Sequence, residues 1–218
     1  MTYLFDKDQL ERLLPGYLSI SEKGRLLSAL EQFHEDSTRK SAEWSGKFYT
    51  NFFLAKSPDY FLQGDLLRGI RQPNWDGAAD EFEKIYAHAL IVSNTCDMDL
   101  SNERVVPKEI VLAPLTPFHD FVEVLSSLLD DGKRLEPIIQ GIKNQIYSNV
   151  FYLPPAPGTN QEFVCFLDNV FWFPTEELNS YLPDLDQTRV ASLDYFGYYL
   201  FLVKLSYHFC RLPEEKQR

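Results

Sequence analysis

The 218-residue sequence has few cysteines and no long hydrophobic run. Its three cysteines, Cys96, Cys165 and Cys210, form no CxxC pair and lack the spacing of zinc ligands, which argues against a structural zinc site and indicates reduced thiols. The most apolar stretch, residues 198–203, is cut by Lys204, whereas a membrane-spanning helix takes roughly 20 apolar residues. The first residues lack the character of a secretory signal, so we expect a cytoplasmic protein without a membrane segment.

Positive charge is also scarce. The chain has 21 Lys and Arg against 32 Asp and Glu, which gives a formal net charge of -11. The imbalance is concentrated in residues 61–131, where 13 acidic and 5 basic residues contribute -8 of the -11. Because binding to nucleic acids and anionic membranes depends on positive charge, both are disfavoured as partners, and any binding of RNA should be weak.

The hydrophobic pattern predicts helices at both ends of a globular chain, of which 44% is hydrophobic. Residues 6–14 form one expected helix. Ser19 and Glu22 have the spacing of a capping box, which marks the start of a second helix. Near the C-terminus a short helix begins at Thr175, and residues 194–211 form a long helix that is apolar nearly all round and should therefore pack against the rest of the protein.

The central part has the pattern of a small antiparallel sheet. Short apolar runs predict strands at residues 64–67, 89–92, 110–115, 150–153, 162–167 and 170–173. Residues 69–84, which contain Pro73 and Gly77, are expected to form a polar and mobile surface loop. The sequence therefore predicts an α+β fold with an N-terminal helical extension (1–60), a small barrel or sandwich (61–175) with a helical insertion (120–146), and C-terminal helices (176–218).

Polar side chains and a thiol gather directly after the apolar run 89–92. This motif consists of Ser93, Asn94, Thr95, Cys96 and Asp97. Such residues can line a binding site, but they also stabilise tight turns by bonding their own backbone. The motif is therefore open to three interpretations: a turn, a contact site for a partner or ligand, or a catalytic site. As a contact site, it would be closed by the loop 69–84.

Two chemistries at this motif have little support in the sequence. A nucleophilic Cys96 needs a base or a positive field, whereas Asp97 and Asp99 supply negative charge. A metal site made from Asp97, Asp99 and Glu103 with His88 or His119 is not accompanied by a calcium loop, a paired-histidine helix or a phosphate loop. No metal and no cofactor are expected, and a small enzyme built around Cys96 and Asp97 is the third-ranked function.

Three short motifs follow one another in the central segment. They are Gln63-Gly64-Asp65-Leu66, the run Ala-Leu-Ile-Val-Ser-Asn at 89–94, and the run Ile-Val-Leu-Ala-Pro-Leu-Thr that ends at Thr116. Their order resembles that of the MazF/PemK family of toxin-type SH3-fold barrels, and residues 162–172 fit the closing strands of that family. The resemblance covers residues 61–175 apart from the insertion and implies a small antiparallel SH3-like barrel. The motif 93–97 also looks like one found in uncharacterised bacterial proteins related to these barrels.

The resemblance implies a particular set of site residues. Members of this family are metal-independent endoribonucleases that use an arginine before the second motif and a serine or threonine after the third. Thr116 matches the hydroxyl residue, whereas the expected arginine position falls in the segment that ends at His88. His88 is then the candidate base, and Arg68, Arg71 and Lys84 are the candidate phosphate-binding groups.

Loss of that arginine favours binding over catalysis, because a permanent cation is replaced by a histidine that is mostly neutral at pH 7. We therefore expect a binding or regulatory component of a bacterial toxin-antitoxin or phage-defence type system. Its binding residues would be the motif 93–97 with Arg68 and Arg71, and its partner another protein; a homodimer is also compatible with the sequence. The alternative is a sequence-selective endoribonuclease that uses His88 and Thr116.

Overall fold

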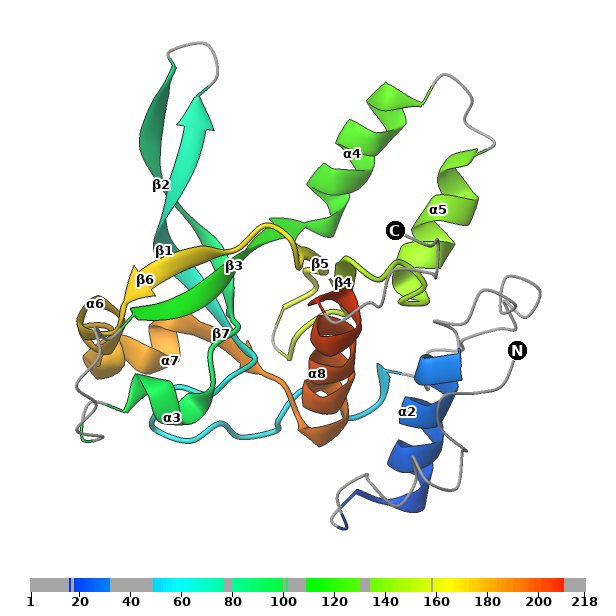
Figure 1. The fold of residues 1–218 in the computed structure, drawn as a ribbon, viewed down its shortest axis with the longest axis horizontal. Helices are drawn as coiled ribbons and strands as arrows, with labels where there is room; N and C mark the ends of the chain where they lie inside the picture. The colour runs from blue at the N-terminus through cyan, green and yellow to red at the C-terminus, as the bar shows by residue number, and fades with distance from the viewer. Residues whose placement is uncertain are drawn as a thin grey trace, which may run out of the picture.

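The computed structural model describes residues 16, 18–31, 49–76, 80–99, 101, 109–129, 134–157 and 159–209. The elements, in chain order, are α2 (Ile20–Glu31), β1 (Asp65–Asp76), β2 (Glu81–Ile91), α3 (Thr95–Met98), β3 (Glu109–Pro117), α4 (Phe118–Leu128), α5 (Leu135–Lys143), β4 (Val150–Leu153), β5 (Phe163–Phe166), β6 (Phe171–Pro174), α6 (Thr175–Asn179), η4 (Leu182–Asp184), α7 (Leu185–Thr188), β7 (Arg189–Ser192) and α8 (Tyr195–Phe209). The α+β class is confirmed (Figure 1).

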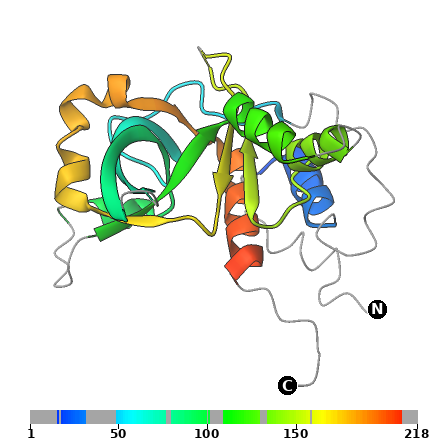
Figure 2. The same cartoon turned by 90° about the horizontal axis from the view of Figure 1, so that it is seen from above.

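The seven described strands form one antiparallel sheet. Six of them follow the order β4-β5-β3-β2-β1-β7, and β6 lies off this order. β6 pairs with the first half of β3, and β5 pairs with the last residues of β3. Within the described residues, no pairing joins the two ends of this order, so the sheet is open. Figure 2 shows that β1 and β2 nevertheless curl tightly at one side of the molecule.

The two faces of the sheet carry separate parts of the core. Opposite residues of antiparallel strands share a face, so Leu90 lies on one face with its partners Leu66 and Ala113. That face packs with α8 and α2 through side chains that include Phe196 and Leu26. The other face is covered by α4 and α5 near β4 and β5, and by α6 and α7 near β1 and β3.

The capping box predicted at the start of α2 is present. The backbone N–H of Ser19 donates to Glu22 Oε2 (2.7 Å), and the N–H of Glu22 donates to Ser19 Oγ (3.2 Å). The hydrogen bonds from Ser19 lower the pKa of Glu22. The guanidinium of Arg25 lies 4.0 Å from the ring centroid of Phe196 and links α2 to α8. The expected helix over residues 6–14 lies outside the described residues.

The prediction of a loop over residues 69–84 is wrong, because β1 and β2 continue through it as a two-stranded ribbon. Asn74 pairs with Glu83, and the pairing continues to Asp76. The prediction rested on Pro73 and Gly77, and Gly77 lies outside the described residues. At Pro73, β1 has no second neighbouring strand among the described residues, and an edge strand tolerates proline. Gly69, with a φ of +68°, lies in a bulge of β1, where a positive φ favours glycine.

The six predicted strands are confirmed, since each overlaps one of β1 to β6. The predicted helical insertion is formed by α4 and α5. β7 was not predicted. It is a four-residue strand inside the region expected to hold only C-terminal helices, and it pairs with the first residues of β1. The short run Arg-Val-Ala-Ser has too little hydrophobic periodicity to be recognised as a strand. None of the described helices is long and apolar enough to cross a membrane.

Candidate functional site

The motif Ser93–Asp97 forms the turn that follows β2. Ser93 lies at the strand end and holds the turn against β3. Its Oγ accepts the N–H of Val111 (2.8 Å), while the N–H groups of Val92 and Ser93 both donate to the Val111 carbonyl (3.0 and 3.2 Å). The polar groups of Ser93 are thus used to join two strands.

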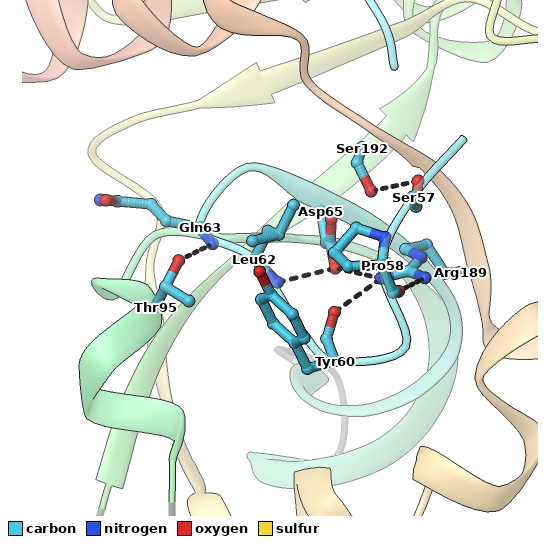
Figure 3. Close-up of polar contacts among 9 residues, drawn as sticks. All are labelled: Ser57, Pro58, Tyr60, Leu62, Gln63, Asp65, Thr95, Arg189 and Ser192. Atoms are coloured by element: carbon cyan, nitrogen blue, oxygen red, sulfur yellow. Dashed lines mark hydrogen bonds and ion pairs between the residues drawn. The ribbon is translucent and has the colours of Figure 1, made fainter. Parts of the chain in front are cut away.

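The next two residues are also engaged in local structure. Asn94 caps α3 and accepts the N–H of Cys96 (3.0 Å) on its Oδ1. Thr95 Oγ1 accepts the N–H of Gln63 (3.0 Å), as Figure 3 shows. The side chain of Gln63 donates to the Val92 carbonyl (2.7 Å), so the turn is tied to the segment that enters β1. These contacts favour the turn interpretation for the first three residues of the motif.

Cys96 and Asp97 occupy the single turn of α3 that completes the motif. Cys96 is exposed, and Asp97 is half-buried with its N–H donating to the Asn94 carbonyl (2.9 Å). The described part of the β1–β2 ribbon does not close over them, since it extends away from α3 (Figure 1). The expected closure of residues 69–84 over this motif is therefore wrong.

Ser93→Ala is expected to lower the free energy of unfolding by about 1–2 kcal/mol, because the N–H of Val111 loses its acceptor. Urea unfolding measures this loss. Ser127→Ala is the control, since Ser127 is exposed and bonds only its own helix at Val124. Equal stability of the two variants would contradict a structural role for Ser93.

A buried ion pair lies close to this turn. Arg189 of β7 donates to Asp65 Oδ2 of β1 (3.2 Å), and the side chains are 5% and 0% exposed. Arg189 also donates to the carbonyls of Tyr60 (2.8 Å) and Pro58, and Asp65 Oδ2 accepts the N–H of Leu62 (2.9 Å). Figure 3 shows how these contacts join the 58–62 segment to both strands.

Burial dominates the electrostatics of this pair. Desolvation raises the pKa of Asp65, although Arg189 and the other hydrogen bonds to the carboxylate act in the opposite direction. The guanidinium is held by three acceptors in one small space. This arrangement fixes the chain at the start of β1 and leaves little of either side chain exposed to a ligand, so we assign the pair a structural role.

The candidate nuclease residues are not brought together. His88 pairs with Leu115, which places both on one face of the sheet. Thr116 is the next residue of β3 and pairs with Val164, so it lies on the opposite face. The His88 ring packs 4.9 Å from the ring of Phe163, and burial, with a smaller effect of Arg68, lowers the pKa of His88. This register does not support joint action of a base at His88 and a hydroxyl at Thr116 on one phosphate.

The two candidate arginines also differ in their surroundings. Arg68 is exposed at the bulge of β1. Arg71 forms an ion pair with Glu177 of α6, and the carboxylate offsets its charge. Of the two arginines proposed to bind phosphate, Arg68 alone presents an exposed side chain without a carboxylate contact among the described residues, and the third candidate, Lys84, is exposed on β2.

The thiols of Cys96 and Cys165 are expected to react very differently. Cys165 is fully buried in β5, and desolvation raises its pKa to about 12, whereas Cys96 is exposed. A thiol-specific chromogenic reagent should therefore modify Cys96 rapidly in the native protein, and Cys96→Ser should remove one fast-reacting thiol. Cys165→Ala should leave the number of fast thiols unchanged. Loss of a fast thiol from that variant would contradict the buried position.

A second buried polar cluster covers the outer edge of β4. The side chain of Gln145 both accepts the N–H of Tyr152 (3.2 Å) and donates to its carbonyl (2.7 Å), as a neighbouring strand would. Lys204 of α8, which is 0% exposed, donates to Gln145 Oε1 (2.9 Å), to its carbonyl (3.2 Å) and to the Val150 carbonyl. Sequence reasoning missed this cluster, because its members lie on three separate elements.

Over the residues that the structure describes, no group of three or more His, Cys, Asp or Glu side chains is arranged to hold a metal ion. The contacts of Ser93, Asn94 and Thr95 and those of the two buried clusters position the backbone. Neither a protein-family model nor a curated protein sequence matches this chain.

Proposed function

We propose that the protein is a binding or regulatory component whose partner is another protein. The observation that carries this proposal is the β1–β2 ribbon. β3 pairs with β2 only over residues 88–91, and β7 pairs with β1 only over residues 65–67. Beyond these points the described pairings of the two strands are with each other, and the ribbon projects from the body of the molecule (Figure 1).

The projecting ribbon displays side chains suited to protein recognition. Tyr86 is 71% exposed and Ile85 is 38% exposed. Aromatic residues are enriched at protein interfaces, where they supply a large contact area. A two-stranded ribbon has little stability of its own, so contact with a partner would also stabilise it.

An enzymatic function is supported less well. His88 and Thr116 lie on opposite faces, Arg71 is paired with Glu177, and the first three residues of the 93–97 motif bond the backbone. The acidic balance of residues 61–131 further disfavours RNA. Within the proposal, the exposed residues of the 93–97 turn and Arg68 form a second contact surface.

The proposal includes the cellular setting that the MazF/PemK resemblance implies. The protein would act in the bacterial cytoplasm, in a toxin-antitoxin or phage-defence type system, on a divergent SH3-like barrel scaffold. The curvature of β1 and β2 and the strand positions of the three motifs support this scaffold. The sheet is open, so closure of the barrel remains part of the proposal.

A site-specific photo-crosslinker at Tyr86, used in cells of the source organism, tests the proposed function. We expect a discrete adduct with a second protein. The matched control carries the crosslinker at Tyr195, which is 55% exposed and begins α8, a helix that lies away from the projecting ribbon (Figure 1). The same adduct from both positions, or adducts with RNA alone, would contradict the proposal. RNA cleavage that is lost on His88→Ala would instead establish the nuclease alternative.

A further inference from the structure

The outer edges of the sheet are covered at both ends of the strand order. At β7, the N–H of Leu54 donates to the Ser192 carbonyl (2.9 Å), and Phe53 forms a bridge with Leu193. At β4, Gln145 takes the place of a neighbouring strand, as described above. Uncovered edges invite pairing with other chains, and proteins commonly protect them.

The two edges of the β1–β2 ribbon are protected to different degrees. On the β1 side, Pro73 supplies no N–H, and the ion pair between Arg71 and Glu177 brings α6 to this strand. β2 contains no proline. Among the described residues, no strand pairs with its outer side between Glu81 and Ala87.

The path of β3 explains why this edge is open. β3 stays beside β2 only as far as the pairing of Leu115 with His88. It then turns at Pro117 into α4, which leads away from β2 in both views (Figures 1 and 2). No described strand therefore occupies the position beside β2 that a longer β3 would have taken. Alternate residues of β2 present their N–H and C=O groups to that position.

Acidic side chains are exposed near both ends of the open edge. Asp80 and Glu83 are exposed on the ribbon, and Asp120 and Glu123 are exposed on α4 just after the point where β3 departs. The exposed cations nearby are Lys84 on β2 and Arg68 on β1, and His119 Nε2 on α4 lies 3.2 Å from Glu123 Oε1. An incoming strand therefore meets a mainly negative surface together with the apolar side chain of Ile85.

We infer that the partner contributes an extended basic segment that pairs as an added strand with the β2 edge at residues 81–87. This inference rests on the proposed function, because it specifies the partner of the same ribbon. Main-chain hydrogen bonds along β2 supply affinity, and alternating lysine or arginine side chains select the negative surface. Apolar residues between them would lie on the opposite face of the strand, which is the face of Tyr86. A second copy of this chain fits less well, because it would bring the same acidic segment against itself.

The direct test measures binding of a fluorescent synthetic peptide of about nine residues, a typical strand length. The peptide alternates lysine with threonine and valine, and its matched counterpart has glutamate in place of lysine. We expect saturable binding of the basic peptide by fluorescence anisotropy, weakening with added salt, and no binding of the acidic one. Bound basic peptide should slow amide hydrogen exchange in β2 at residues 81–87.

A charge reversal on the ribbon separates this edge from general attraction to an acidic protein. Glu83→Lys should weaken binding of the basic peptide about fivefold, whereas Glu176→Lys should change it less than about twofold. The control makes the same change at an exposed residue of α6, on the β1 side. Far-ultraviolet circular dichroism verifies that both variants fold.

Three results would overturn the inference: equal binding of the basic and acidic peptides, equal weakening by the two variants, or a dimer of this chain that forms through the ribbon. If any of these occurred while the crosslinker at Tyr86 still captured a second protein, the inference would fail and the proposed function would stand. If the crosslinker captured no protein but the peptide bound at β2, the proposed function would lose its support while the edge would remain competent for strand addition.

Discussion

Arg189→Met is expected to lower the free energy of unfolding by about 3–5 kcal/mol, the usual cost of breaking a buried ion pair by removing one partner. The carboxylate of Asp65, which is 0% exposed, would lose the guanidinium that faces it. The carbonyls of Pro58 and Tyr60 would lose their donor as well. Urea unfolding followed by the fluorescence of the three tryptophans measures the loss.

Arg68→Met is the matched control for this experiment, because Arg68 is exposed on β1 and the substitution should change stability by less than about 0.5 kcal/mol. Adding Asp65→Asn to Arg189→Met should recover part of the lost stability, since it removes the unpaired charge. A free energy of unfolding for Arg189→Met within about 1 kcal/mol of wild type would contradict the structural role of the pair.

Lys204→Met is expected to lower the free energy of unfolding by about 2–4 kcal/mol. Methionine has a similar length but supplies no N–H, so the Val150 carbonyl and the two Gln145 oxygens lose a donor, and unsatisfied buried acceptors cost about 1–3 kcal/mol each. Because Gln145 covers β4, hydrogen exchange should accelerate there. Lys56→Met is the exposed control, and stability equal to that of wild type would contradict the role of Lys204.

The same variant has a distinct pH signature. Burial lowers the pKa of Lys204 well below its usual value of 10.5. Between the lowered pKa and 10.5 the unfolded chain binds more protons than the folded protein, so the stability of wild type gains a contribution that rises with pH. Lys204→Met should lack that contribution over the pH range just below 10.5. Parallel pH profiles for the two proteins would contradict the shift.

Much of the sheet could be predicted because its strands are apolar runs of ordinary length. Residues 89–92 and 110–115 are clear examples, since both faces of β2 and β3 are buried there. The ribbon at 70–76 and 81–87 could not be recognised in the same way. Its side chains are largely exposed, and its strands are held by cross-strand hydrogen bonds that leave no hydrophobic pattern.

The buried polar clusters were beyond sequence reasoning for another reason. Asp65 and Arg189 are 124 positions apart, and Gln145 and Lys204 are 59 positions apart. No local spacing indicates that such residues meet. Once β7 pairs with β1, however, Arg189 lies opposite Leu67 and close to Asp65. The strand that was missed in the sequence therefore carries the residue that completes the pair.

The candidate site shows how register decides function. His88 and Thr116 belong to adjacent strands, and the sequence interpretation placed them in one catalytic site. Neighbouring residues of a strand point to opposite faces of the sheet, so a register that differs by one residue separates two such side chains. The structure pairs His88 with Leu115 and so leaves Thr116 on the other face. In the 93–97 motif, by contrast, the residue types alone indicated a turn, and the contacts of Ser93 and Asn94 agree with that interpretation.

The central claim is that a partner protein engages the open edge of β2. Hydrogen exchange of the complex formed with the protein captured at Tyr86 tests it most directly, compared with exchange of the chain alone. We expect the amides of residues 81–87 to exchange more slowly in the complex, by at least about tenfold at alternate positions. Unchanged exchange in this segment, with slowing confined to the Ser93–Asp97 turn, would contradict the claim and place the contact surface at the other end of β2.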